Sequence, residues 1–257
     1  MMQAGMQQLL AWKGVAVGVW FALFFIAERW HPAASPRLAE PSSRRLSRNA
    51  GLWAGNAVLS LLVIVPASGW AAAQALDWRP AWWSGASGLV IDLLLLDVLI
   101  YWWHRANHVV PLLWRFHAVH HLDRFLDTTS AVRFHAGEVL LSALARAGVI
   151  VLLAIPLSSV LAFEALVLMA AIFHHSNLRL PPALERALSW VIVTPSIHWV
   201  HHHRLRADTD SNYATILSLW DRLFASRSPH PRSPEMPIGV EAREEEAVLG
   251  LLAAPFR

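Results

Sequence analysis

The sequence predicts an all-α, polytopic membrane protein with about three spans plus a helical hairpin, and with a histidine-rich helical cap on the cytoplasmic side. Three observations predict this fold. Hydrophobic residues make up 56% of the 257 residues and charged residues only 15%, whereas about a quarter of an ordinary soluble domain is charged. Several apolar runs are long enough to cross a bilayer. The histidines gather in sets that follow such runs.

Three apolar segments in the first 103 residues are predicted to span the membrane. The first, residues 9–27, has about 20 residues, enough to cross roughly 30 Å of hydrocarbon as a helix. A basic loop rich in Pro and Ser follows at 32–50, and a second span at 52–73. The connector 74–86 holds three tryptophans, which are typical of the membrane–water interface. The third span, 87–103, leads directly into the first histidines.

The distribution of arginine predicts the orientation of these spans. The 32–50 loop carries four arginines, whereas the only charged residues of the 74–86 connector are Asp77 and Arg79. Because basic loops stay on the cytoplasmic side, the third span should deliver the histidines to the cytoplasmic surface. Lys13 is the only lysine. This bias toward arginine is typical of a GC-rich bacterial source, so we expect a protein of the bacterial inner membrane.

A helical hairpin is predicted between residues 139 and 173. The apolar run is broken at Pro156, which leaves two halves of about 17 residues, the lower limit for a span. Arg146 and Glu164 would lie level with each other in such a hairpin. Since a charge at membrane depth is costly unless it is paired, we expect these side chains to meet or to share a polar pocket. A shallow re-entrant hairpin is the alternative.

The chain is predicted to have three parts. Residues 1–84 hold the N-terminal transmembrane helices and the basic loop. Residues 85–226 carry nearly all of the histidines together with the motifs described below. Residues 227–257 form a tail that is expected to pack on the cytoplasmic face. There is no cysteine, which excludes disulfides, thiolate ligands and iron–sulfur clusters held by this chain.

Eight histidines fall into three sets with helical spacing. Residues three and four apart share one face of a helix. Neutral imidazole binds iron, zinc, copper and nickel well. Eight ligands exceed what one ion takes, so the sequence predicts a dimetal site in the cap. The three sets are His104 and His108; His117, His120 and His121; and His198, His201 and His202.

Seven further residues are predicted to complete this site. His135 and His175 lie at the two ends of the hairpin, on the same surface as the three sets, and would bring the number of ligands to ten. Metal-bound histidine usually donates its second N–H to a carboxylate or a carbonyl group. The residues predicted to surround the ligands are Asp97, Glu138, Asp210, Asn212 and Asp221.

The motifs also share an order and a spacing over residues 85–226. They run Asp97-x3-Tyr101-x2-His104, Trp114-Arg-Phe-His117, Arg133-x-His135-x2-Glu138, His175-Ser-Asn177, Thr194-Pro-x2-His198, Asp210-x-Asn212-Tyr213 and Trp220-Asp-Arg-Leu-Phe224. In this order they resemble the fatty acid hydroxylase/sterol desaturase superfamily of integral membrane di-iron enzymes. Two positions depart from the pattern: Ala136 and Ala214 stand where many members have proline and glycine, and neither would touch a ligand.

The resemblance implies an oxidoreductase, an O2-dependent lipid hydroxylase or desaturase. Its cofactors would be two iron ions (Fe2+/Fe3+) held by histidine, with O2 as co-substrate. Its partners would be the lipid bilayer, a hydrophobic lipid substrate such as a sterol or a fatty acyl chain, and an external electron donor. That donor would be a ferredoxin or a cytochrome with its reductase, because the chain has no flavin, haem or iron–sulfur motif. The resemblance leaves the substrate, its regiochemistry and the choice of reaction open.

Two non-oxidative functions compete with this interpretation. A membrane zinc hydrolase would use metal-activated water and a general-base carboxylate, as in H-E-x-x-H, a motif that the chain lacks. A metal transporter would hold its ion near the middle of the bilayer, whereas these histidines are predicted at one surface. Nucleic-acid binding, which a high pI can indicate, is not expected because the arginines flank apolar spans.

Overall fold

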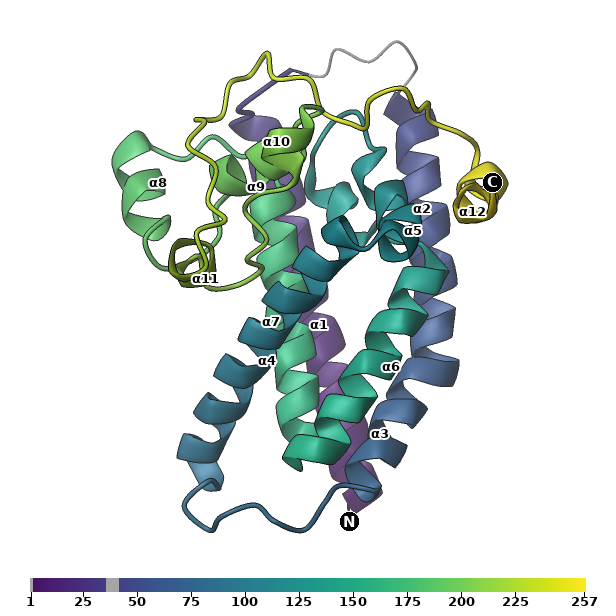
Figure 1. The fold of residues 1–257 in the computed structure, drawn as a ribbon, viewed down its shortest axis with the longest axis vertical. Helices are drawn as coiled ribbons and strands as arrows, with labels where there is room; N and C mark the ends of the chain where they lie inside the picture. Colours follow the sequence, from purple (N-terminus) through teal and green to yellow (C-terminus); the bar gives the residue numbers. More distant parts are fainter. Residues whose placement is uncertain (1, 36–41) are drawn as a thin grey trace.

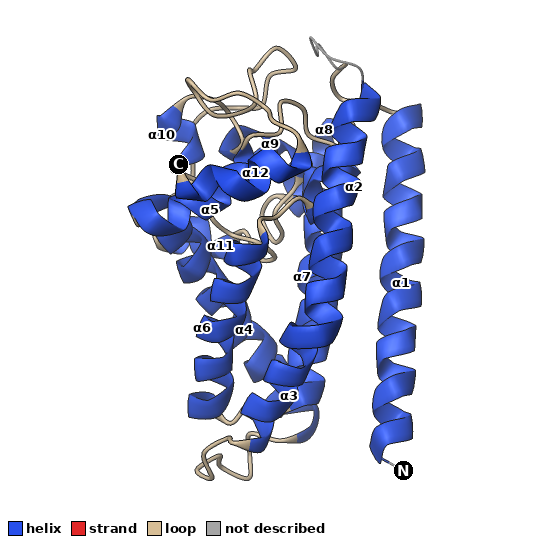
Figure 2. Cartoon of the chain, turned by 90° about the vertical axis from the view of Figure 1, so that its right-hand side faces the viewer, coloured by secondary structure: helices blue, strands red, loops and turns tan. Residues whose placement is uncertain are grey.

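The computed structural model describes residues 2–35 and 42–257, and the regular elements within these ranges are all helical, as predicted. Five helical segments are long and apolar enough to cross a membrane. They form an elongated bundle (Figure 1, Figure 2). Their bounds are α1, Met2–Trp30; α2, Ser42–Leu59, continued by a π-helical turn, Ser60–Ile64, and by α3, Val65–Ala73; α4, Gly85–Val109; α6, Ala136–Leu153; and α7, Leu157–His175.

The remaining helices are short and gather at one end of the bundle, where they form a cap (Figure 1). Both α4 and α7 run toward this end, so their last turns reach the cap. The predicted helical cap is therefore confirmed. Its elements are α5, Pro111–His121; a 3-10 turn, Thr128–Val132; α8, Pro182–Leu188; α9, Pro195–His201; α10, Arg206–Thr209; α11, Leu219–Leu223; α12, Val248–Ala253; and a 3-10 turn, Ala254–Phe256.

Helix α2 begins at Ser42, within the segment that the sequence predicts as a basic loop. Residues 36–41 of that segment, including Arg37, lie outside the described residues. The loop prediction is wrong for 42–50 because part of its positive charge is buried rather than solvated. Arg45 is 3% exposed, and its Nε lies 2.7 Å from Asp123 Oδ1. A buried acidic partner lets the helix continue beyond the apolar run.

The second span changes helix type midway. A π-helical turn at Ser60–Ile64 separates α2 from α3. Pro66, just beyond it, has no N–H to donate to the preceding turn, and a proline at this point disfavours regular α-helical hydrogen bonding. Ser60 and Ile64 both line the internal cavity described below. The wider turn thus lies where the bundle is hollow.

Helices α6 and α7 form the predicted hairpin. Ala154 between them is left-handed, with φ 51°, and Pro156 is the N-cap of α7. The expected meeting of charges is confirmed: Arg146 Nη2 lies 3.1 Å from Glu164 Oε1. Lys13 of α1 reaches the other carboxylate oxygen, with Nζ 2.6 Å from Oε2. One carboxylate therefore joins three spans.

The C-terminal tail packs on the cap through α12. Leu251 is fully buried and packs with Leu52 of α2, Val119 of α5 and Leu122. These contacts join the end of the chain to the second span and to the helix that carries the middle histidine set.

Candidate metal centre

Nine histidines converge in the cap as two groups, each with the donors to hold a metal ion. Within each group the ring nitrogens lie within 4.8 Å of one another. All but His104, which is half-buried, are buried. The first group is His104, His108, His117, His121 and His201, and the second is His120, His175, His198 and His202.

The two H-x2-H-H triplets are each divided between the groups. On α5, His117 and His121 are four residues apart and belong to the first group, while His120 belongs to the second. On α9 the assignment is reversed: the middle member, His201, belongs to the first group and the outer two to the second. Because the members of a triplet point in different directions around the helix, each triplet brings both groups together.

In five of these histidines, Nδ1 lies within hydrogen-bonding distance of an oxygen atom, as is usual for a histidine that binds a metal through Nε2. His117 Nδ1 lies 2.7 Å from Glu138 Oε1. An Nδ1 that donates its proton to oxygen leaves the Nε2 lone pair free for a metal. Backbone carbonyl oxygens hold the other four, namely Tyr213 for His104 at 2.8 Å, Arg133 for His120 at 2.9 Å, Ala171 for His175 at 2.8 Å and Ser211 for His201 at 2.6 Å.

The facing Nε2 atoms fit metal ions. His175 Nε2 lies 3.1 Å from His120 Nε2, and His201 Nε2 lies 3.1 Å from that of His104. The Nδ1 atoms of these four rings lie against carbonyl oxygens. With the proton on Nδ1, the facing Nε2 lone pairs repel each other unless a cation lies near both. Two nitrogens bound to one ion at about 2.1 Å lie at most about 4.2 Å apart, close to the spread in each group. The donor set thus suits one ion per group.

Burial keeps the cap histidines neutral. It lowers the pKa of each of these rings well below the ordinary value of 6.5, because the charged form would lose its hydration, and repulsion between neighbouring rings adds to this effect. Neutral imidazole is the form that binds metals. The rings concerned are His120, His121, His198, His201 and His202.

His135 joins neither group. Its Nδ1 accepts a hydrogen bond from the Gly137 N–H at 2.8 Å and so caps α6, while its Nε2 lies 3.0 Å from the carbonyl oxygen of Leu252. It connects the hairpin to the tail. His174, in contrast, packs against His198 with ring centroids 4.0 Å apart and the rings tilted, although it belongs to neither group.

Glu138 and Asp210 are the predicted surrounding residues that face ligands directly. Asp210 Oδ1 lies 3.4 Å from His108 Nδ1, and its Oδ2 accepts a hydrogen bond from Arg206 Nε at 2.7 Å. The Arg206 guanidinium carbon also lies 4.2 Å from the Trp114 ring centroid. Together these side chains cover the outer side of the first group.

The other three surrounding residues hold the backbone near the ligands. Asp221 accepts a hydrogen bond from the Tyr213 N–H at 2.8 Å, and the carbonyl group of Tyr213 holds a ligand in turn. Asn212 Nδ2 donates to the backbone of α9 at 3.2 Å. Asp97 bonds to no histidine in the described part of the chain; it accepts from Trp220 Nε1 at 2.7 Å. Asp97 thus anchors α11 to α4.

Arg133 supports the second group in a way that its motif position does not reveal. The residue is fully buried, and its carbonyl oxygen holds His120. Its side chain donates from Nε to the Val119 carbonyl oxygen at 2.9 Å and from Nη1 to Asn49 Oδ1 at 3.0 Å. The backbone that orients His120 is thereby fixed to both α5 and α2.

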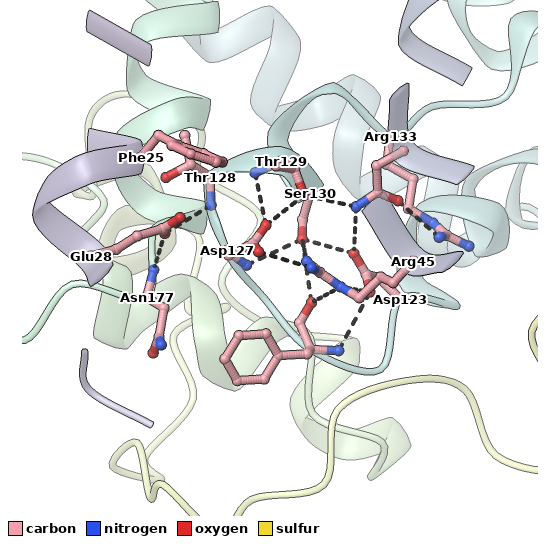
Figure 3. A network of polar contacts seen from close by, with 12 residues as sticks. Phe25, Glu28, Arg45, Asp123, Asp127, Thr128, Thr129, Ser130, Arg133 and Asn177 are labelled. Carbon is pink, nitrogen blue, oxygen red and sulfur yellow. Dashed lines mark hydrogen bonds and ion pairs between the residues drawn. The ribbon is translucent and has the colours of Figure 1, made fainter. Parts of the chain in front are cut away.

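A buried polar network continues from Arg133 to Glu28 of α1 and to Asn177, just beyond α7 (Figure 3). Arg45 pairs with Asp123; burial would raise the pKa of this carboxyl, but the arginine charges overcome it and hold the pKa below its ordinary value. At the other end, Glu28 Oε2 accepts the backbone N–H groups of Thr128 and Asn177, both at 2.9 Å. In the sequence, only the position of Glu28 at the end of the first apolar run could have indicated this role. Its partners, Thr128 and Asn177, lie at least 100 residues away along the chain.

A cavity of about 360 Å³ lies between the spans beneath the histidines. Histidines of both groups line its cap end, and Lys13, Arg146 and Glu164 line it as well. Lys13 is a cavity residue that no motif indicates. An apolar molecule in this cavity would contact histidines of both groups. The apolar side chains along it include Ile100, Trp103, Phe163 and Val167.

Comparison with known proteins identifies a family whose model covers all nine converging histidines. A model of the fatty acid hydroxylase family matches residues 89–226. An ornithine lipid hydroxylase from Rhizobium tropici is 29% identical over 177 residues, which cover 69% of this chain and 53% of that protein. An alkylglycerol monooxygenase from Danio rerio is 32% identical over 158 residues, 60% of this chain and 32% of that protein.

A very-long-chain aldehyde decarbonylase from Oryza sativa subsp. japonica is 28% identical over 165 residues, which cover 56% of this chain and 24% of that protein. The chain therefore spans about half or less of the length of these relatives. No solved structure matches it.

Proposed function

Because the chain belongs to the fatty acid hydroxylase family, we propose that it is a membrane-bound oxygenase that oxidises a C–H bond of a lipid with O2 and external electrons. Hydroxylation is the favoured outcome, since relatives include a lipid hydroxylase and a monooxygenase; desaturation is the alternative. The observation that carries the proposal is that two buried histidine groups share one largely apolar cavity. The proposed substrate is a lipid with a long hydrocarbon portion.

The proposed cofactors are two iron ions, with the first group supplying five imidazoles and the second supplying four. His135 is not needed for either ion, because both of its ring nitrogens have partners elsewhere. When bound, the irons supply the redox chemistry that activates O2 and oxidises an unreactive C–H bond.

The chain's own contribution is orientation and exclusion of water. Glu138 holds the Nδ1 proton of His117, which keeps the Nε2 lone pair directed at the metal position. Trp103 and Phe163 line the cavity and would press a hydrocarbon chain against the histidines. The apolar walls also limit the access of water to the histidines.

We place the cap on the cytoplasmic side of a bacterial inner membrane. The arginine-rich start of α2 lies at the cap end of the bundle, whereas the connector with few charges lies at the opposite end (Figure 1). This arrangement supports the orientation inferred from the positive-inside rule. A ferredoxin, or a cytochrome with its reductase, would deliver electrons at the cap.

Anaerobic purification of the full chain, followed by metal analysis and O2-uptake measurements with reductant and mixed membrane lipids, tests the proposal. We expect about two irons per chain and lipid-dependent O2 uptake. Label from isotopic O2 should enter the lipid if the reaction is hydroxylation and not if it is desaturation. Tightly bound zinc, with no O2 uptake after reconstitution with iron, would contradict the proposal.

One pair of variants links the activity to the histidine groups. His120→Ala should lose metal and activity while the protein still inserts into the membrane. His230→Ala is the matched control, because this ring is more than half exposed and pairs with Asp208 outside both groups. Equal loss in the two variants would point to a general folding defect instead.

A further inference from the structure

Three charged side chains from three different spans meet in the cavity. Glu164 of α7 lies between Lys13 of α1, with Oε2–Nζ at 2.6 Å, and Arg146 of α6, with Oε1–Nη2 at 3.1 Å. The three side chains are 15–22% exposed. All three line the cavity that also contacts the ligand histidines.

The charges in this cluster do not balance. Two cations share one carboxylate, and both of its oxygens are already occupied, so one positive charge is in excess. Arg146 Nε is buried and has no hydrogen-bond partner among the described residues. By contrast, the Arg79–Asp92 pair at the connector end of the bundle is matched one to one. Since unpaired charge within a span is costly, an excess cation facing a cavity indicates an anionic ligand.

The cluster lies well below the histidines. Glu164 precedes His175 on α7 by eleven residues, so the two lie about 16 Å apart along the helix axis. Apolar side chains, Ile100 and Phe163 among them, line the cavity along with these groups. One cavity thus combines a cationic region, an apolar wall and a metal-binding region.

A second groove gives access to the cluster from the side of the bundle. It lies between α4 and α6 and is lined almost entirely by apolar residues, including Leu96, Leu99 and the exposed Trp102. Arg146 lines both the groove and the cavity, as do Ile100, Trp103, Ser142 and Phe163. A ligand approaching through the bilayer would therefore meet Arg146 on its way to the cavity.

We infer that Lys13 and Arg146 bind the carboxylate of a long-chain fatty acid, whose hydrocarbon chain extends along the cavity toward the histidines. Arginine suits this ligand because its planar fork matches a carboxylate, and Arg146 keeps an N–H group unused for it. The identification of this acid as the substrate rests on the proposed function. The C–H bonds beside the histidines would then lie on the order of a dozen carbons from the carboxylate.

The test compares the binding of palmitic acid and methyl palmitate to the full chain in detergent, without reductant. The acid should bind at least about tenfold more tightly than the ester, because only the acid offers a charged acceptor. Arg146→Gln should bring this ratio close to one. Glu164→Gln should raise the ratio, because it removes the competing carboxylate; a cluster that served only to join the spans would lose acid and ester binding alike.

Arg44→Gln is the matched control, because Arg44 is exposed at the cap end of α2 and should leave the ratio unchanged. Wild-type protein gives a second measurement: Lys13 is the only lysine, so mass spectrometry can follow its acylation by a hydrophobic active ester. Palmitic acid should protect Lys13, and methyl palmitate should not.

Equal affinity for acid and ester in the wild type overturns the inference, as does a ratio that Arg146→Gln leaves unchanged. Binding is measured without turnover, so the outcome is separable from the proposed function. An active oxygenase without acid preference contradicts the inference alone, and an inactive protein that keeps the preference contradicts the proposed function alone.

Discussion

The two histidine groups use the same motif but differ in the number of their imidazoles. The first has five and the second has four. Their support is similar, because in each group two rings have an Nδ1 atom without a hydrogen-bond partner among the described residues: His108 and His121 in the first, and His198 and His202 in the second. The other rings are oriented by Glu138 or by backbone carbonyl groups. The number of imidazoles therefore favours the first group, so the second should depend more on each of its members.

The largest expected effect is the loss of the second metal in His198→Ala. This change leaves three imidazoles in a group that has no spare ligand, and the removed ring also packs against His174. We expect iron to fall from about two to about one per chain and lipid oxidation to stop. Retention of both irons would show that the second group does not hold a metal as assigned.

A smaller effect is expected for His108→Ala in the first group, because four imidazoles remain there. Both irons should stay bound after purification, with the affinity of one reduced on the order of a hundredfold. Metal titration against a chelator measures this difference. If His108→Ala loses iron as completely as His198→Ala, the contrast between the two groups disappears.

Glu138→Gln tests how a proposed metal ligand, His117, is oriented, and it removes no imidazole. The amide keeps the shape of the side chain but weakens the hydrogen bond from His117 Nδ1, which is 2.7 Å long in the wild type. The cost should be about tenfold in metal affinity, confined to the first group. An equal loss of metal affinity in the second group would mean that binding of the two ions is coupled.

The smallest effect on metal is expected for Asp97→Asn. Asp97 accepts hydrogen bonds from Trp220 Nε1 and from the Leu217 N–H and meets no ligand in the described part of the chain. Thermal unfolding should move to a lower temperature, with a loss of about 1 kcal/mol, while iron content stays unchanged. A drop in iron content would restore the direct role that the sequence predicts for this residue.

Much of the fold could be predicted from the sequence. The spans, the hairpin and the histidine sets each depend on the spacing of residues within one continuous segment. Apolar length predicts the five long helices, and the positions of Arg146 and Glu164 around Pro156 predict that they meet. Helical spacing also places the members of each histidine set near one another, which is what the two groups require.

What could not be predicted depends on how distant segments pack. Spacing alone cannot decide which member of a triplet faces which group, because that is fixed by the rotation of α5 and α9 against their neighbours. Asp97 lies two turns from His104 on α4, yet α11 packs there and takes its hydrogen bonds. Lys13 appears as an isolated charge in the first span until α1 is placed beside α7.

The division of each triplet between the two groups has a consequence for biosynthesis. The first group contains residues from His104 to His201, and the second contains residues from His120 to His202. Neither group can be completed until the last spanning helix and α9 have both been made, although most of the ligands are translated earlier. Domains generally form from the N-terminus during synthesis, but here a chain made only as far as His121 carries four imidazoles of the first group and one of the second. The first group can therefore be nearly assembled early, whereas the second has to wait for α7 and α9.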